Sequence, residues 1–421
     1  METKTKSIMP TEHRVQSYTV TQKAKPPYQT TRPTLRVLGT EINALPEIQS
    51  RAASDLGIKI VFEKLDFQQA QRRSALEPHS YDIYDQCFHN LDIVWFWRAI
   101  QPIEISRIHR WNEISDLTKI GQISPNASIG RGDAPVTKLY VQTDNTLDSR
   151  PTTRISMLPT IHNVDSFVYR TDHCGNEPPT SWAALLDPRW HGRVALVDEP
   201  AIGIFDAILA AQASGALKFH DLGQLDIGEI DALTDLLIAK RSGGHFINFW
   251  KTADEAADWM INGTTWLQSL WSPSLTTLQR RGIPVRQAVP IEGYRAWHGG
   301  LCLSSGLSGR MRDVAYEYLN WWLDGYAGAV AARQGYYMSI PERVKYHLSH
   351  NEWCYWYEGA PALSPLTAPD GTMIVQAGET RSGGSYWQRI GSIAVWNTTM
   401  DEHNYLARRW ARLVKPLHAN E

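Results

Sequence analysis

The sequence predicts an α/β protein with two lobes, each a mostly parallel sheet flanked by helices, and a ligand cleft between the lobes. The first observation is an alternation of short apolar strands with helical stretches, which is typical of parallel sheets. The second is a pair of apolar segments, 155–170 and 293–303, that indicate crossings out of one lobe and back into it. The third is the length of 421 residues, which allows two domains. Clefts between lobes are favoured ligand sites, and such lobes close about a hinge.

The first lobe begins with a β-α-β-α-β order. Its predicted elements are strands at 35–38, 58–62 and 81–85 and helices at about 45–56 and 69–76. Gly57 follows the first helix at the position where a glycine with positive φ commonly ends a helix. Helices that connect consecutive strands in this way place those strands parallel to each other.

The second lobe and the tail continue this alternation. Their predicted elements are a short helix at about 182–186, strands at 194–197 and 266–271, and helices at 204–213, 230–240, 252–262, 311–324, 327–334 and about 390–414. The stretch 359–384 is rich in Pro and Gly and predicts a loop before the final helix. The motif 396–402, Trp-Asn-Thr-Thr-Met-Asp-Glu, is expected on that final helix, with a solvated charged face.

The expected domain organisation has four parts. They are an N-terminal arm at 1–33, a first lobe at 34–160 plus about 297–345, a second lobe at 161–296, and a C-terminal segment at 346–421 that packs on the second lobe and across the hinge. The arm is polar and rich in Thr, Lys and Gln, which is typical of a disordered segment. It has no apolar core or cleavage site of a signal peptide, so the sequence leaves open whether the protein is exported.

Composition excludes several functions. A formal net charge of −2 does not favour a nucleic acid partner, and no apolar run approaches the ~20 residues of a membrane helix. The four cysteines, Cys87, Cys174, Cys302 and Cys354, are far apart, which argues against a zinc site or redox pair. Free core cysteines and, in an exported protein, one or two disulfides are both open interpretations. The 17 Trp and 17 Tyr suit a ligand cleft as well as a core.

The most informative stretch is TSWAALLDPRWHGRVALVD at 180–198. Thr180 or Ser181 can cap the short helix, because its side-chain oxygen accepts a free backbone N–H. A Pro-Arg-Trp-x-Gly turn then leads into the buried strand 194–197. Glu199 comes directly after this strand, at the edge of an α/β sheet where ligands commonly bind.

This stretch resembles the solute-binding proteins of ABC importers, specifically the spermidine/putrescine-binding group, in which a similar run precedes a strand that delivers an acid to the ligand cleft. The similarity covers about residue 35 to the C-terminus. It implies the type II periplasmic-binding fold, capture of a small polar, amine-bearing solute, delivery to a membrane permease, a monomeric state and a periplasmic location. It implies neither a cofactor nor a metal.

The resemblance also implies a set of ligand-binding residues. The positions that match cleft residues of the family are Glu199, Trp271, Trp297, Tyr336 and Gln388, together with Thr40, Asn43, Cys87 and His89, at which this chain departs from the family's residue types. In the family, carboxylates and aromatic faces hold the ligand amines, because a desolvated ammonium needs an opposite charge or a π face.

Two further departures remove charge from the expected cleft. The family's second acid on the segment after 194–197 aligns with Ile202, and an aspartate two residues after the crossing tryptophan aligns with Gly299. Lost counter-charges at a buried ammonium cost on the order of several kcal/mol. The sequence therefore favours a smaller or singly charged amine, or a mixed polar compound, over a polyamine.

Three alternatives stay open at this point. Cys87 and His89, two residues apart, allow an enzyme with a thiol nucleophile and a base, although no orienting third group is identifiable. Tyr336, Tyr337 and His298 are a faint indication of an iron-binding version of the fold. An intracellular sensor is favoured only by the missing signal peptide. On the final helix, a permease contact is the alternative to a solvated face.

Overall fold

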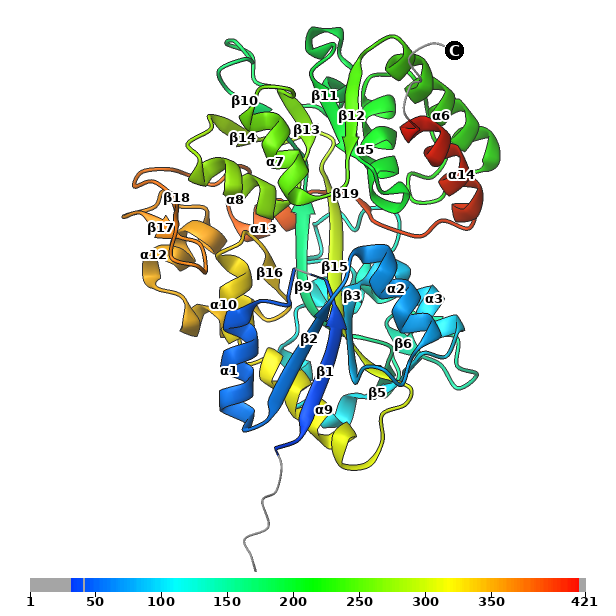
Figure 1. Cartoon of the computed structure of the whole chain (residues 1–421), viewed down its shortest axis with the longest axis vertical. Helices are drawn as coiled ribbons and strands as arrows, with labels where there is room; N and C mark the ends of the chain where they lie inside the picture. The colour runs from blue at the N-terminus through cyan, green and yellow to red at the C-terminus, as the bar shows by residue number, and fades with distance from the viewer. Residues whose placement is uncertain (1–31, 41, 416–421) are drawn as a thin grey trace, which may run out of the picture. The chain divides into compact units, whose positions relative to one another are not determined.

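The computed structural model describes residues 32–40 and 42–415, so most of the expected N-terminal arm lies outside the described residues. The first lobe is built on one large sheet with the strand order β16-β9-β15-β3-β1-β2, and β4 and β19 also pair with β15 (Figure 1). Its strands are β1 (Thr34–Gly39), β2 (Lys59–Lys64), β3 (Ile83–Cys87), β4 (Ile100–Gln101), β9 (Leu158–Asp165), β15 (Tyr294–Ser304), β16 (Tyr337–Met338) and β19 (Ile393–Trp396).

The N-terminal β-α-β-α-β order is confirmed. Strand β1 pairs parallel with both β2 and β3, and helices α1 (Pro46–Leu56) and α2 (Phe67–Leu76) connect these strands. Gly57 ends α1 with a φ of 65°, as its position in the sequence predicts. Asp66 caps α2 by accepting the N–H of Gln69 at 2.7 Å. Because connecting helices make these three strands parallel, their carboxyl ends lie at one edge of the sheet.

The second lobe is built on a five-stranded sheet with the order β12-β11-β13-β10-β14. Its strands are β10 (Phe167–Arg170), β11 (Val194–Val197), β12 (Phe246–Trp250), β13 (Leu267–Ser269) and β14 (Val285–Gln287). Strand β11 pairs parallel with β12 and with β13. Helices α5 (Pro200–Ala213), α7 (Ala253–Ile261) and α8 (Ser272–Arg280) begin directly after these three parallel strands. Their N-termini therefore gather at one edge of the sheet.

The two-lobed α/β fold predicted from the sequence is confirmed, and both of its sheets are mixed. The chain leaves the first sheet at Asp165 and enters the second at Phe167, and it returns through β15. Strand β15 is antiparallel to both β9 and β3, and β10 is antiparallel to β13. The crossing strands are antiparallel to these neighbours because each carries the chain from one lobe to the other.

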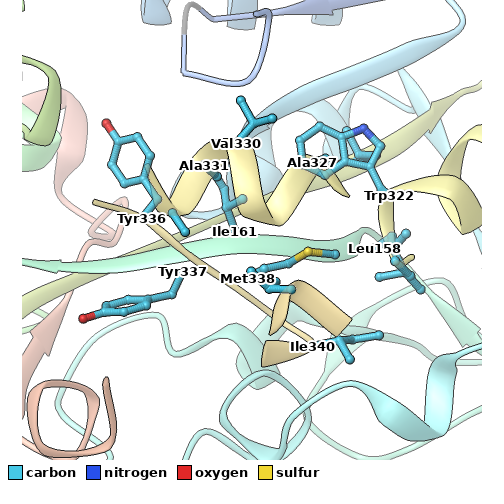
Figure 2. Packing of buried hydrophobic residues seen from close by; sticks show 14 of the residues in the cluster. Leu158, Ile161, Trp322, Ala327, Val330, Ala331, Tyr336, Tyr337, Met338 and Ile340 are labelled. Carbon is cyan, nitrogen blue, oxygen red and sulfur yellow. The ribbon is translucent and has the colours of Figure 1, made fainter. Parts of the chain in front are cut away.

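Of the four hydrophobic clusters among the described residues, the C-terminal segment contributes to the large one in each lobe, here called the first and second cores. Part of the first core packs helix α10 (Tyr326–Ala332) against β9 and β16, as Figure 2 shows. Trp353 and Tyr386 are also buried in this core. Helix α14 (His403–Val414) instead lies beside α6 (Ile227–Ser242) of the second lobe, where Trp410 is fully buried.

The remaining elements complete the described chain. The other helices are α3 (Leu91–Phe96), α4 (Asp116–Ile120), α9 (Gly309–Trp322), α11 (Pro341–Val344), α12 (His350–Trp353) and α13 (Tyr386–Ile390). A small sheet has the order β5-β8-β6-β7, with β5 (Ile103–Glu104), β6 (Tyr140–Val141), β7 (Leu147–Asp148) and β8 (Arg154–Ile155). All four cysteines are free.

Three expected elements are wrong in part. The predicted helix at about 390–414 is two helices, α13 and α14, separated by strand β19, because β-branched Ile393 and Val395 pair with β15. The motif at 396–402 therefore begins in a strand and continues into a turn before α14. The stretch 359–384 contains a short hairpin, β17 (Leu366–Thr367) and β18 (Met373–Val375). The helix after Ser181 is a 3₁₀ helix, Trp182–Leu186, and Ser181 caps it.

Candidate functional site

A pocket of about 1010 Å³ is lined by residues of both lobes. The first lobe contributes the segments after β1 and β2, the ends of β3 and β9, the start of β15 and the residue before β16. The second lobe contributes the N-termini of α5, α7 and α8, and helix α14 also reaches the pocket. Because strand ends and helix starts meet here, side chains from distant parts of the sequence share one space.

Glu199 occupies the position that the sequence predicts, directly after β11 and on the pocket. Its side chain caps α5 by accepting the N–H of Ala201 at 3.3 Å, and it accepts the Nε2 amide of Gln68, from the first lobe, at 3.1 Å. Burial raises the pKa of Glu199, and the hydrogen bonds from Gln68 and Ala201 oppose that shift. Glu199 therefore joins the two lobes and keeps a carboxylate toward the pocket.

Three aromatic side chains predicted from the sequence line the same pocket. Trp297 and Tyr336 lie edge to face with ring centroids 5.4 Å apart, and both come from the first lobe. Trp271 directly precedes α8 in the second lobe and packs edge to face on Trp250, with ring centroids 4.7 Å apart. Figure 2 shows Tyr336 and Tyr337 pointing away from each other, so that only Tyr336 lines the pocket. The pocket thus has π faces on both sides.

Thr40 and Cys87 also line the pocket, whereas Asn43, His89 and Gln388 do not. The Nδ2 amide of Asn43 donates to Asp85 Oδ1 at 2.8 Å within the first lobe. His89 stacks on Phe67, which itself lines the pocket, with ring centroids 4.9 Å apart. Gln388 is exposed and forms a capping box with Ser385 at the start of α13. The structure therefore gives Gln388 a local structural role.

The environment of Cys87 and His89 opposes a thiol nucleophile. Burial, together with nearby Asp85 and Asp165, raises the pKa of the Cys87 thiol to about 12. Burial lowers the pKa of His89 to about 3. A reactive cysteine needs a depressed pKa and a base that can take its proton. At neutral pH this pair consists of a thiol and a neutral imidazole.

The two positions at which the family's acids are missing differ in their setting. Ile202 lines the pocket in the first turn of α5. Gly299 is in the middle of β15 between β3 and β9 and does not line the pocket. A Cβ atom at Gly299 would lie 3.3 Å from the Gln86 carbonyl oxygen and 3.5 Å from Ile161 Cγ1. The side chain of an acid at position 202 would face the pocket. At position 299, the Cβ atom of an acid would lie against the Gln86 carbonyl oxygen.

Sequence reasoning missed a buried group of charges at the same pocket. Arg295, at the start of β15, donates from Nε to Asp206 Oδ1 at 2.8 Å, and its Nη2 lies 3.6 Å from Asp165 Oδ2. Both Asp165 and Arg295 line the pocket, and each is at most 2% exposed. Burial raises the pKa of Asp165 to about 6, although Arg295 opposes the shift. The sequence signal that could have indicated this group is a charged residue within each apolar crossing segment, Asp165 in 155–170 and Arg295 in 293–303.

Charges around the pocket favour a cation. The lining acids outnumber the lining bases by five to three; the acids are Asp66, Asp165, Asp198, Glu199 and Asp254, and the bases are Lys64, Lys251 and Arg295. The described residues contain no group of three or more His, Cys, Asp or Glu side chains arranged to hold a metal ion. Among the helices within 32–40 and 42–415, none has the length and apolar character needed to cross a membrane.

The comparisons with known proteins agree with this architecture. Residues 149–357 match the family of bacterial extracellular solute-binding proteins. No curated protein sequence matches the chain. The family match at 149–357 begins just before the crossing into the second lobe and ends after β16. It therefore includes Glu199, Trp271, Trp297 and Tyr336.

Solved structures extend the likeness to most of the chain. The spermidine/putrescine substrate-binding protein PotD of Streptococcus pneumoniae superposes with a TM-score of 0.60 at 13% identity, covering 91% of this chain and 100% of that chain. The PotD lipoprotein of Treponema pallidum has a TM-score of 0.63 at 10% identity, covering 90% and 99%. The binding protein AgtB of A. tumefaciens R10, solved with agropinic acid, has a TM-score of 0.55 at 12% identity, covering 91% and 99%. Residues 149–357 thus carry the match to the bacterial extracellular solute-binding family, and the chain has the two-lobed fold of ABC-transporter solute-binding proteins.

Proposed function

We propose that this protein captures a small, amine-bearing cation between its lobes and delivers it to the permease of an ABC transporter. The observation that carries this proposal is the pocket itself, in which π faces from both lobes lie beside an excess of acids. An ammonium that leaves water is stabilised by an opposite charge and by an aromatic face. The family match at 149–357 supports a binding function for this pocket.

The binding function is favoured over an enzyme on the same fold. The raised pKa of Cys87 keeps the thiol protonated, and the lowered pKa of His89 makes its neutral imidazole a weak base for that proton, so both shifts disfavour nucleophilic catalysis. The pocket walls carry aromatic and acidic groups that suit binding of a cation without further chemistry. A periplasmic location, a monomeric state and a permease partner belong to this proposal, and the match to an extracellular solute-binding family supports the location.

Nine residues were proposed from the sequence as ligand contacts, and the structure favours a smaller set. Six of them line the pocket, namely Thr40, Cys87, Glu199, Trp271, Trp297 and Tyr336. We propose that Glu199 and the three aromatic side chains contact the solute, because they supply the charge and the π faces. His89 supports the pocket from behind by stacking on Phe67, whereas Asn43 bonds to Asp85, which does not line the pocket.

Titration calorimetry with four-carbon compounds tests the proposal. Putrescine, 1-butylamine, γ-aminobutyrate and butyrate have the same chain length and differ in charge. The proposal predicts measurable binding of at least one of the two cationic amines and none of butyrate. Glu199→Gln is expected to weaken amine binding about tenfold or more, since it removes a charge facing the ligand. Glu317→Gln, an exposed change on α9, serves as the control. Binding of butyrate alone would contradict the proposal.

A further inference from the structure

We infer that Asp165, the last residue of β9, is the carboxylate that receives an ammonium group of the solute, in a site walled by Trp297 and Tyr336. This inference rests on the proposed function and assigns one specific group to it. It also places the acid on the crossing between the lobes, away from the segment on which the sequence comparison expects a second acid, at Ile202.

The other acids of the pocket have partners or are open to water. Asp66 caps α2 through the N–H of Gln69 at 2.7 Å. Asp198 lies 3.5 Å from the Nζ of Lys251. Asp254 is exposed, and water screens an exposed carboxylate. Glu199 accepts hydrogen bonds from Gln68 and Ala201. Asp165 differs from all of these, because it is 2% exposed and its nearest cation is shared with another acid.

Asp165 shares its nearest cation with another buried acid. Arg295 is the cation of the group, and it is closer to Asp206, at 2.8 Å from Nε, than to Asp165, at 3.6 Å from Nη2. Two buried carboxylates therefore share the Arg295 guanidinium at close range, and the buried Arg389 acts on Asp165 only from beyond ion-pair distance. A buried charge without a full partner is costly, and a ligand cation that supplies the missing charge is bound correspondingly well. Because Asp206 does not line the pocket, Asp165 is the acid of this pair that a solute can reach.

The surroundings of Asp165 suit an ammonium. The Trp297 indole lies beside the Asp165 carboxylate and helps to lower its pKa, against the effect of burial. Tyr336 lies edge to face with that indole. The Nδ2 amide of Asn163 is 3.1 Å from Asp165 Oδ1 and also 3.1 Å from Ser272 Oγ, at the start of α8 in the second lobe. An ammonium at Asp165 thus has a carboxylate, two aromatic rings and a residue of the opposite lobe within the same site.

Calorimetry on Asp165→Asn tests this assignment with putrescine and 1-butylamine as the probes. The substitution keeps the shape of the side chain and leaves Arg295 paired with Asp206, so the fold should persist. We expect the affinity for the amines to fall about 30-fold or more. Asp258→Asn, an exposed change on α7, is the matched control and should bind as the unmodified protein does. Equal affinity of the two variants would overturn the inference.

Carboxyl ¹³C NMR of the unmodified protein gives a second test that does not depend on a variant. An ammonium in contact with Asp165 should lower the pKa of this carboxyl below its ligand-free value when the amine saturates the protein. An unchanged pKa at saturation would overturn the inference. If the unmodified protein binds no amine, the proposed function fails instead, so the two failures are distinguishable.

Discussion

Arg295 donates from Nε to Asp206 Oδ1 over 2.8 Å, and this bond joins strand β15 of the first lobe to helix α5 of the second. Both side chains are fully buried, at 1% and 0% exposure. Arg295 Nη1 also donates to Asn397 Oδ1 at 3.2 Å, which brings the segment after β19 into the same group. A buried ion pair at the crossing between lobes fixes the two sheets to a common point beside the pocket.

Replacing Asp206 by alanine should destabilise the protein, because the more distant Asp165 is then the one carboxylate still paired with Arg295. Removing one partner of a buried ion pair typically costs about 3–5 kcal/mol. Urea unfolding of the ligand-free protein should therefore show a decrease in the free energy of unfolding near the lower end of this range, since Asp165 remains as a partner of Arg295. Asp258→Ala on the exposed face of α7 is the control. A loss of less than about 1 kcal/mol would show that the pair contributes little to the free energy of unfolding.

Asp85 should make the folding free energy depend on pH in a defined direction. Burial raises the pKa of Asp85 from 3.8 to about 7, and the Asn43 amide opposes the shift. Between these values the folded state holds a proton that the unfolded state has released, so the stabilising contribution of this group decreases as the pH rises toward 7.

Asp85→Asn removes that dependence and keeps a side chain of the same shape. We expect the stability of the variant relative to the unmodified protein to increase by more than about 1 kcal/mol from pH 4 to pH 7, then to level off. Urea unfolding at several pH values measures this difference in the free energy of unfolding. The contributions of the buried histidines to its pH dependence cancel, because both proteins contain them. A difference that stays constant with pH would exclude a raised pKa at Asp85.

Trp297 should contribute to amine binding through its π face. Trp297→Leu keeps an apolar side chain in the first core but removes the ring beside Tyr336 and Asp165. A desolvated cation–π contact is worth about 2 kcal/mol, so the affinity for putrescine or 1-butylamine should fall about tenfold or more. Trp387→Leu is the matched control, since Trp387 is 44% exposed and lies outside the pocket. An equal effect of both substitutions would argue against a ring contact.

A carboxylate at position 202 should strengthen binding of a dication. Ile202 lines the pocket in the first turn of α5, where the helix dipole also favours an acid. Ile202→Glu is expected to raise the affinity for putrescine about tenfold, and Ile202→Gln, of equal size but neutral, should not. The same reasoning does not extend to Gly299→Asp, because a side chain there meets the Gln86 carbonyl and Ile161 instead of the pocket. Calorimetry that finds equal affinities for the Glu and Gln variants would contradict the role given to charge.

Much of the fold could be predicted from local sequence signals. The strands of the first lobe, Gly57 at the end of α1 and the strand before Glu199 all follow from short apolar runs and helix boundaries. The break between α13 and α14 was missed because the residues around Ile393 also fit a helix in an apolar run. Their strand state depends on pairing with β15, about 100 residues earlier, and no local pattern records that partner.

The site was predictable where a residue follows a strand. Glu199 and Trp271 line the pocket, and each comes directly after a strand of the second sheet. Gln388 lies outside the pocket, in a motif whose residues form a helix cap. The charges at Asp165 and Arg295 were missed since their roles depend on antiparallel pairing of two crossing strands, where Arg295 lies opposite Asp165.

Mass spectrometry of the small molecules released on denaturing the purified protein, followed by calorimetry with the recovered compound, identifies the solute. We expect a small cationic amine that rebinds the emptied protein and loses affinity when Asp165 or Glu199 is neutralised. Recovery of an anionic or uncharged solute that rebinds equally well to Asp165→Asn and Glu199→Gln would contradict this expectation.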